Sequence, residues 1–213
     1  MNFRIIAYII GWVCNFQAAF MLLPAVTAII YWEKDLFAFL ISMVICLSVG
    51  IPLTLRKPKN KVFYIKDGCV AVALSWIALC ITGALPFWLT SSIPHPIDAL
   101  FETVSGFTTT GASILTDVEV LPHSVLIWRS FTHWIGGMGV LVFLLSLLPL
   151  TGGYHMNLMK AESPGPSVSK LVPKVQSTAK ILYTIYIGIT LLQIILLLIG
   201  RVPLFDTLCI SFG

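Results

Sequence analysis

Apolar residues of this chain are gathered in long runs that shorter polar segments separate. A helix needs about 20 apolar residues to cross a bilayer core about 30 Å thick, and four runs reach that length: 5–32, 36–55, 68–90 and 181–200. A fifth run, 121–150, also qualifies if Arg129 and His133 are tolerated near its outer end. Pro24 is expected to kink the first run, because proline removes a helical hydrogen bond. The pattern predicts an all-α protein with several membrane spans.

Composition supports the same class of protein. The chain is 58% hydrophobic and 10% charged, with a mean hydropathy of +0.96, whereas soluble domains are about 25% charged. The net charge of +4 does not indicate nucleic acid as a partner, because the basic residues lie in loops between apolar runs. Membrane lipid is the expected surrounding. We expect no cleavable signal peptide, since the first apolar run is too long for one.

Enzyme chemistry finds no support in the sequence. No nucleophile–base pair, P-loop or metal motif is present, so we expect neither an enzyme nor a covalently bound cofactor. The cysteines have no CxxC spacing and no histidine at ligand distance, which predicts that they are small buried hydrophobic residues. They are Cys14, Cys46, Cys69, Cys80 and Cys209.

Charged loops predict how the spans are oriented. Segment 56–66 holds five Lys or Arg residues and 151–180 holds four lysines, whereas 67–128 holds no Lys or Arg. The positive-inside rule therefore predicts that the N-terminus and both basic loops are cytoplasmic. The connection 91–121 then faces outward, and the Pro- and Ser-rich linker 160–174 is a mobile cytoplasmic loop. A multi-pass protein of the plasma membrane, the inner membrane of a bacterium, is the expectation.

The outward connection carries an unusual polar segment, FETVSGFTTTGAS, at 101–113. Asp98 is expected to cap a short helix, 99–107, that cannot span a membrane. The following TTTGAS favours extended or irregular backbone, because threonine is β-branched and glycine is permissive. Such backbone is tolerated at membrane depth only where protein buries it or where it lines a watery cavity. The pattern predicts a re-entrant pore loop, with an ordinary extracellular turn as the alternative.

Cation conduction is the chemistry that such a loop suits. A dehydrated monovalent cation needs several weak oxygen ligands, which backbone carbonyls supply. The short helix would direct the negative end of its dipole toward the ion. Asp117 and Glu119 either concentrate cations at the mouth or lie in a solvated loop.

A repeat supports the pore-loop interpretation. LFETVSGFTT at 100–109 aligns with LFDTLCISFG at 204–213, and each follows an outward-going span. Leu, Phe, an acid and Thr match in order. Chance explains four matching residues, but less readily four matches at equivalent topological positions. The unit is span, pore helix, filter, span. We therefore divide the chain into two leading spans with a basic loop (1–66), a first complete unit (67–150), a cytoplasmic linker (151–177), and the first span and truncated pore helix of a second unit (178–213).

Arg129 and His133 lie on one helix face, four residues apart. An unpaired charge inside a span is costly, so Arg129 either tunes cation entry or stabilises the loop through an ion pair with Glu102 or a cap on pore-helix carbonyls. We favour the stabilising role, and for His133 a hydrogen-bonded packing role. The glycines of GGMG, 136–139, permit close helix packing or a bend, and packing is favoured.

The segment FETVSGFTTTGAS, followed by WRSFTHWIGGMGVLVF at 128–143, closely resembles the membrane subunit of the Trk/Ktr/HKT potassium transporters. The two extra leading spans point to the TrkH type, and the resemblance covers essentially the whole chain. It implies four units around a pseudo-fourfold pore. It also implies that Gly111 is a filter glycine that marks potassium preference, and that the carbonyls of Thr109 and Thr110 coordinate potassium, the substrate. The residues that would support this filter are Thr108, Ala112, Ser113, Glu102 and Arg129.

The resemblance also implies partners and a longer parent. Members bind a cytoplasmic nucleotide-binding regulatory subunit, called TrkA in this branch, and a homodimer is expected for the full-length form. This chain has one complete unit where members have four, so it corresponds to the N-terminal portion. Three hypotheses follow: a pore-forming potassium uptake subunit, a truncated product that inserts without conducting, and a homo-oligomeric cation channel. The unfinished second unit argues against the third, and a membrane enzyme is a distant fourth.

Overall fold

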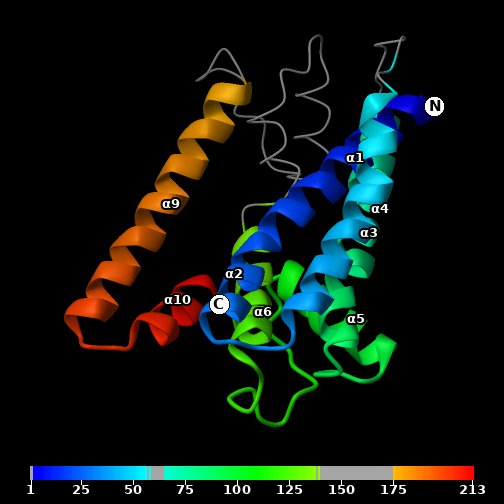
Figure 1. The fold of residues 1–213 in the computed structure, drawn as a ribbon. Helices are drawn as coiled ribbons and strands as arrows, with labels where there is room; N and C mark the ends of the chain where they lie inside the picture. The colour runs from blue at the N-terminus through cyan, green and yellow to red at the C-terminus, as the bar shows by residue number, and fades with distance from the viewer. Residues whose placement is uncertain (1, 57, 59–64, 138, 140–174) are drawn as a thin grey trace.

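The computed structural model in Figure 1 describes residues 2–56, 58, 65–137, 139 and 175–213. Within these ranges the chain forms helices and no strand, which confirms the all-α prediction. The helices are α1 (Phe3–Phe20), α2 (Leu22–Ile30), α3 (Leu36–Leu55), α4 (Ile65–Leu89), α5 (Pro96–Phe107), α6 (His123–Gly137), α9 (Val175–Ile199) and α10 (Leu204–Phe212).

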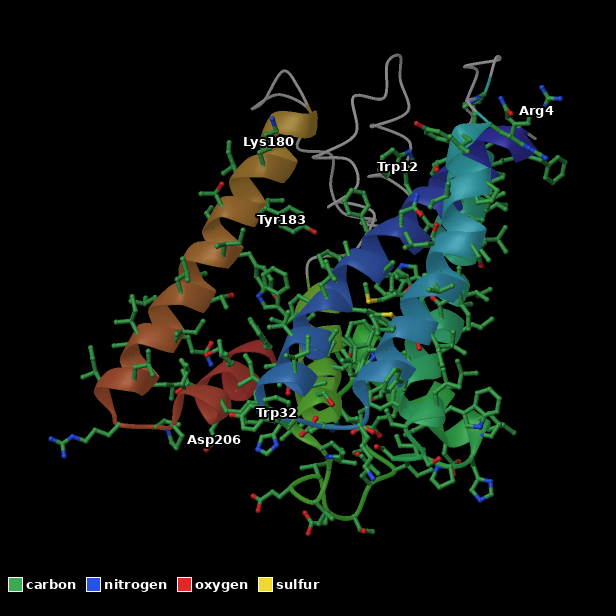
Figure 2. All side chains as sticks on the ribbon, in the orientation of Figure 1. Arg4, Trp12, Trp32, Lys180, Tyr183 and Asp206 are labelled. Carbon is green, nitrogen blue, oxygen red and sulfur yellow. The ribbon has the colours of Figure 1, made fainter. Side chains whose placement is uncertain are left out.

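Four of these segments are long and apolar enough to cross a membrane: Phe3–Ile30, Leu36–Leu55, Lys66–Leu89 and Lys180–Ile199. They match the four predicted runs to within a few residues. Of the fifth run the structure describes only α6 and Gly139, and the remainder lies outside the described residues, as does most of the linker. Figure 2 places Arg4 and Lys180 toward one end of the molecule and Trp32 and Asp206 toward the other.

The first span is interrupted where proline predicts it. In a regular helix the ring of Pro24 would clash with the carbonyl of Phe20, one turn before it, and the proline nitrogen donates no hydrogen bond. Accordingly α1 ends at Phe20 and α2 begins at Leu22, with Met21 forming the junction. The interruption lies within one turn of Pro24, in keeping with the predicted effect of proline.

The leading span α1 packs closely against α3 and α4. Glycine makes the crossing with α3 possible, because a Cβ on Gly11 would lie 2.7 Å from the Cβ of Leu53. At the crossing with α4, the buried Gln17 donates from Nε2 to the carbonyl of Leu79 (3.0 Å) and accepts from the hydroxyl of Thr82 (2.6 Å). Its polar atoms are thereby satisfied in an apolar surrounding.

The cysteine prediction is correct in part. Cys14, Cys46 and Cys80 are buried, Cys209 is half-buried, and Cys69 is exposed on α4. The prediction is wrong for Cys69 because lipid is as apolar as a protein core, so an apolar run does not distinguish buried positions from lipid-facing ones.

The helix pair α9 and α10 meets the rest of the molecule mainly at α6, while most of α9 stands apart (Figure 1). The ring of Phe212 lies 5.2 Å from that of Phe131, measured between centroids. Trp134 donates its indole N–H to the hydroxyl of Thr190 (3.1 Å), and its carbonyl accepts from the hydroxyl of Tyr186 (3.0 Å). Helix α6 therefore joins the first unit to the start of the second.

Candidate filter loop between α5 and α6

Helix α5 begins earlier than predicted. Pro96 occupies the first turn and His95 precedes the helix, so the prediction that Asp98 caps a helix starting at 99 is wrong. Proline suits this position because the first helical N–H groups have no intrahelical partner. Asp98 instead lies within the first turn, where a carboxylate interacts favourably with the helix dipole. The end of the helix at Phe107 is as predicted.

The end of α5 turns the chain through a left-handed residue. The N–H of Thr110 donates to the carbonyl of Ser105 and that of Thr109 to the carbonyl of Gly106, both at 2.9 Å. These two bonds form a Schellman motif. Thr109 takes the left-handed position with φ +55°, which glycine usually occupies and which is costly for a β-branched residue. The backbone of the candidate filter loop, residues 108–114, is therefore strained at its start.

Threonine hydroxyls support this turn. Thr108 donates to the carbonyl of Val104 (2.7 Å), and its hydroxyl lies 2.8 Å from that of Thr110. Thr109 donates to the carbonyl of Thr108 (2.7 Å). These bonds engage each hydroxyl locally, and all residues of the loop are exposed in this chain.

The backbone conformation at position 111 requires glycine, whereas the space around its Cα would accommodate a side chain. Its φ is +75°, which an L side chain adopts only with strain. A Cβ built on Gly111 would meet no atom within 4 Å, in contrast to Gly136, where it would run into the backbone carbonyl of Phe107. The loop thus faces open space at Gly111, while α5 and α6 pack tightly behind it. This contact favours the packing role for Gly136, whereas Gly139 lies beyond the end of α6 with a left-handed φ of +68°.

Glu102 of α5 attaches the candidate filter loop to α6. Its side chain is 1% exposed and forms an ion pair with Arg129, whose Nε lies 2.6 Å from Oε1. The same carboxylate accepts from the hydroxyl of Ser113 at 3.0 Å and from the N–H of Ile114 at 3.1 Å. The predicted Arg129–Glu102 ion pair is confirmed. A buried carboxylate is tolerated only when it is paired and hydrogen-bonded in this way.

The other predicted residues make no contact with the carboxylate of Glu102 among the described hydrogen bonds. His133 contacts the carbonyl of Arg129 through Nδ1 (3.1 Å), in keeping with its packing role. Ala112 is exposed. Asp117 accepts from the N–H of Glu119 (2.9 Å) within an exposed turn, an arrangement compatible with both roles considered for this pair.

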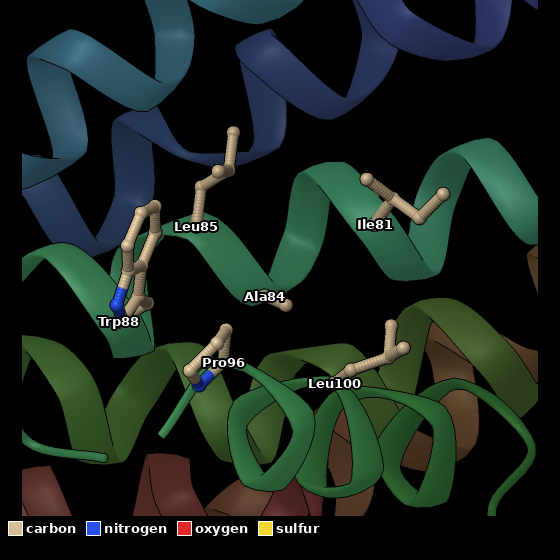
Figure 3. A pocket seen from close by; sticks show the side chains of 6 residues that line it. All are labelled: Ile81, Ala84, Leu85, Trp88, Pro96 and Leu100. Atoms are coloured by element: carbon tan, nitrogen blue, oxygen red, sulfur yellow. The ribbon is translucent and has the colours of Figure 1, made fainter. Parts of the chain in front are cut away.

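A groove of about 220 Å³ lies between α4 and the start of α5 (Figure 3). Its lining is apolar, so it offers no ligands to an ion. The lining residues are Ile81, Ala84, Leu85, Trp88, Pro96 and Leu100.

Sequence reasoning missed Glu33, which lies 90 residues before the helix that it contacts. Its carboxylate accepts hydrogen bonds from the N–H groups of His123 and Ser124 at the start of α6. No local sequence signal links these segments. Only folding brings the connection between α2 and α3 to the N-terminus of α6.

Four apolar helices able to cross a membrane, one of which packs against a short helix that ends in a hydroxyl-rich loop, define a multi-pass membrane protein. Comparison with known proteins then identifies the family. Residues 35–203 match the family model TrkH, described as a cation transport protein, and the chain belongs to this family. The family consists of transport proteins and not of enzymes.

Individual relatives agree with this assignment. The chain is 36% identical to the Trk system potassium uptake protein TrkG of Escherichia coli K12 over 97% of its length, and 36% identical to TrkH of Salmonella typhimurium over 100%. It also superposes on the crystal structure of the potassium transporter TrkH from Vibrio parahaemolyticus, with a TM-score of 0.80, 28% identity and 100% coverage. The chain spans only 43% and 45% of the two relatives and 42% of the solved structure.

Proposed function

We propose that this chain supplies two leading spans and the first pore unit of a potassium uptake subunit in a bacterial inner membrane. The relatives named as potassium uptake proteins support the proposal. The observation that carries it is the geometry at Gly111, where φ is +75° and a Cβ would meet no atom within 4 Å. A backbone exposed there can present carbonyl oxygens to an ion without side-chain interference.

In this proposal 101–113 is a re-entrant pore loop. The carbonyls of Thr109 and Thr110 replace part of the hydration shell of potassium, the transported substrate. Threonine hydroxyls, together with Ala112 and Ser113, maintain the backbone that presents these carbonyls. The charge of Glu102 is compensated by Arg129 at 2.6 Å, so the site binds a cation without retaining it through an excess charge. No covalently bound cofactor is needed.

One unit cannot surround an ion, so a complete pore needs further units of the same kind. The relatives are more than twice as long as this chain, which favours a single longer polypeptide over a homo-oligomer of one-unit chains. The proposed divisions are 1–66, 67–150, 151–177 and 178–213.

We further propose that the N-terminus and both basic segments, 56–66 and 151–180, face the cytoplasm. A TrkA-like nucleotide-binding regulatory subunit would then bind on that side, and the full-length protein would form a homodimer within the lipid. Trp32, at the opposite end of the first span, is 93% exposed, as expected for a residue in an interfacial aromatic belt.

The test is Gly111→Ser in a full-length protein that contains this chain. A side chain at a backbone with φ +75° strains the filter, so we expect the ratio of potassium to sodium uptake to fall by about tenfold or more, which corresponds to about 1.4 kcal/mol. Uptake of labelled rubidium and sodium by cells lacking other potassium transporters measures this ratio.

Gly188→Ser is the matched control, because a Cβ on Gly188 also meets no atom within 4 Å but its φ is not in the left-handed region. This variant should retain the original ratio. An unchanged ratio for Gly111→Ser, at normal abundance in the membrane, would count against the filter assignment.

A further inference from the structure

The carboxylate of Glu33 occupies the N-terminus of α6. Oε1 accepts from the N–H of His123 (2.7 Å) and Oε2 from the N–H of Ser124 (3.0 Å). The first N–H groups of a helix have no intrahelical partner, and the helix dipole places partial positive charge there. A single side chain from outside the helix therefore satisfies two of these groups and compensates the dipole.

The connection that carries Glu33 is held in a defined position. Trp32 takes the left-handed position after α2 with φ +56°, and the N–H of Glu33 donates to the carbonyl of Ala28 at 2.9 Å. The ring of Tyr31 stacks on that of His123, with centroids 3.9 Å apart and planes at 7°. Phe205 of α10 meets both rings edge-on, with its centroid 4.8 Å from that of His123. The connection thus fixes α6 from the leading spans and also contacts the second unit.

The same helix carries the residue that secures the loop. Arg129 lies less than two turns after Ser124 and binds Glu102 at 2.6 Å. Glu102 in turn accepts from Ser113 and Ile114. Helix α2 supports this arrangement by packing along α6. A continuous series of contacts therefore runs from Glu33 through α6 to the candidate filter loop.

We propose that Glu33 is a positioning residue for potassium selection. By capping α6 it fixes the position of Arg129 along the helix axis. Arg129 in turn holds Glu102, which holds the backbone of the candidate filter loop. This inference rests on the proposed function. It assigns to the leading pair of spans, which lies outside the span–pore helix–span unit, a role in the selectivity of that unit.

The ionisation of Glu33 supports its role as a cap. Burial alone would raise the pKa of this carboxyl, but hydrogen bonds from Ser124 and His123 outweigh burial and lower the pKa below its ordinary value. A lowered pKa in the folded state means that the cap is complete above the ordinary pKa and is lost as pH falls through the folded value. The titratable side chain that faces Glu33 from α6 is His123, whose Nδ1 lies 3.1 Å from Oε1. Lys34 and Asp35 lie on the same connection, and Asp206 follows Phe205 on α10.

The test compares Glu33→Gln with Lys34→Gln in a full-length protein expressed in cells, where the outer face meets the medium. Glutamine keeps the size of the side chain but not its charge, and it can offer only one strong acceptor to the two N–H groups. We expect the potassium-to-sodium uptake ratio to fall roughly fivefold in Glu33→Gln, as suits the loss of a helix cap. Lys34→Gln changes a neighbouring exposed residue and should keep the ratio.

An external pH profile separates positioning from general stability. The ratio of the unsubstituted protein should decline as the medium is acidified below about pH 4.5, the ordinary range of a glutamate. Glu33→Gln should lack the part of that decline that comes from Glu33, and Glu33→Asp, which keeps the charge, should recover part of both the ratio and the profile. Other carboxyls titrate in every variant, so the difference between the curves reports on Glu33.

The outcomes distinguish this inference from the proposed function. If Gly111→Ser lowers the ratio and Glu33→Gln does not, the role of Glu33 is refuted and the filter assignment stands. If neither variant changes the ratio, both proposals fail. If Glu33→Gln does not accumulate in the membrane, Glu33→Asp decides. Its shorter side chain cannot keep both N–H contacts at their present length, so a lowered ratio would support the proposal and a ratio identical to that of the unsubstituted protein would overturn it.

Discussion

At the scale of single residues, Glu102 determines how the candidate filter loop is attached. It is almost fully buried, yet it holds an ion pair and hydrogen bonds from two further residues, so α5, the returning chain and α6 meet at one carboxylate. Removing one partner of a buried ion pair lowers stability far more than replacing both partners by apolar residues, because the remaining charge is left without compensation. The ion pair therefore favours a structural role for Arg129.

We therefore expect Arg129→Gln to reduce stability more than selectivity. The change leaves the carboxylate of Glu102 buried without its charged partner, at a cost of about 3 kcal/mol or more. Thermal unfolding of the purified full-length protein in detergent should show a lower midpoint, and its yield should fall. Arg201→Gln, at an exposed position, serves as the control.

The double variant Glu102→Gln with Arg129→Gln sharpens this test. Removing both charges should destabilise the protein less than the sum of the single changes, because no unpaired charge remains. Normal stability of Arg129→Gln together with altered selectivity would instead show that its charge acts on the ion.

At the scale of helices, backbone proximity sets the position of the loop relative to α6. Helices α5 and α6 approach so closely that Cβ atoms on Gly106 and Gly136 would run into Thr132 and the carbonyl of Phe107. Small residues permit such contact inside a membrane, where packing rather than the hydrophobic effect holds helices together. The indole of Trp128 adds a hydrogen bond to the carbonyl of Gly83 at 3.0 Å, so α6 is also fixed to α4.

Gly136→Ala should separate α5 from α6. The obstructing atoms belong to the backbone, which cannot rotate away, so we expect a loss of about 1–3 kcal/mol in unfolding free energy. Gly188→Ala meets no atom within 4 Å and should be neutral or slightly stabilising, because alanine favours a helix over glycine. Equal thermal midpoints for the two variants would show that the helices can move apart without cost.

At the scale of the whole molecule, the leading spans are integrated with the first unit, whereas the second helix pair is attached mainly through α6. Gln17 joins α1 to α4, Glu33 caps α6, and Phe212 and Trp134 connect α10 and α6. The remaining surface of α9 is apolar and exposed, as befits a helix that faces lipid or further spans.

Residues 1–213 expressed alone should enter the membrane but transport no potassium, because a single loop cannot enclose an ion pathway. Rubidium uptake by cells that produce this segment, compared with cells that produce the full-length protein, measures the difference. Uptake by the segment alone, abolished by Gly111→Ser, would instead favour a homo-oligomeric channel.

The amino-acid sequence alone determined the class of fold. Hydrophobic runs predicted four of the spans to within a few residues, because a bilayer imposes a minimum apolar length on any helix that crosses it. Proline placed the break in the first span, and the short polar segment at 101–113 marked the candidate filter loop. These features follow from local composition, which is why they could be predicted without coordinates.

Only the tertiary structure decided which of these segments meet. The sequence offered the ion pair of Arg129 with Glu102 as one of several roles for Arg129, and only the structure selected it. Nothing in the sequence indicated that Glu33, 90 residues from His123, caps α6. The sequence also did not predict that Cys69 is exposed, because lipid and protein core favour the same side chains. Hydropathy reports that a helix lies in an apolar phase, whereas the partners of its few polar atoms depend on how the helices pack.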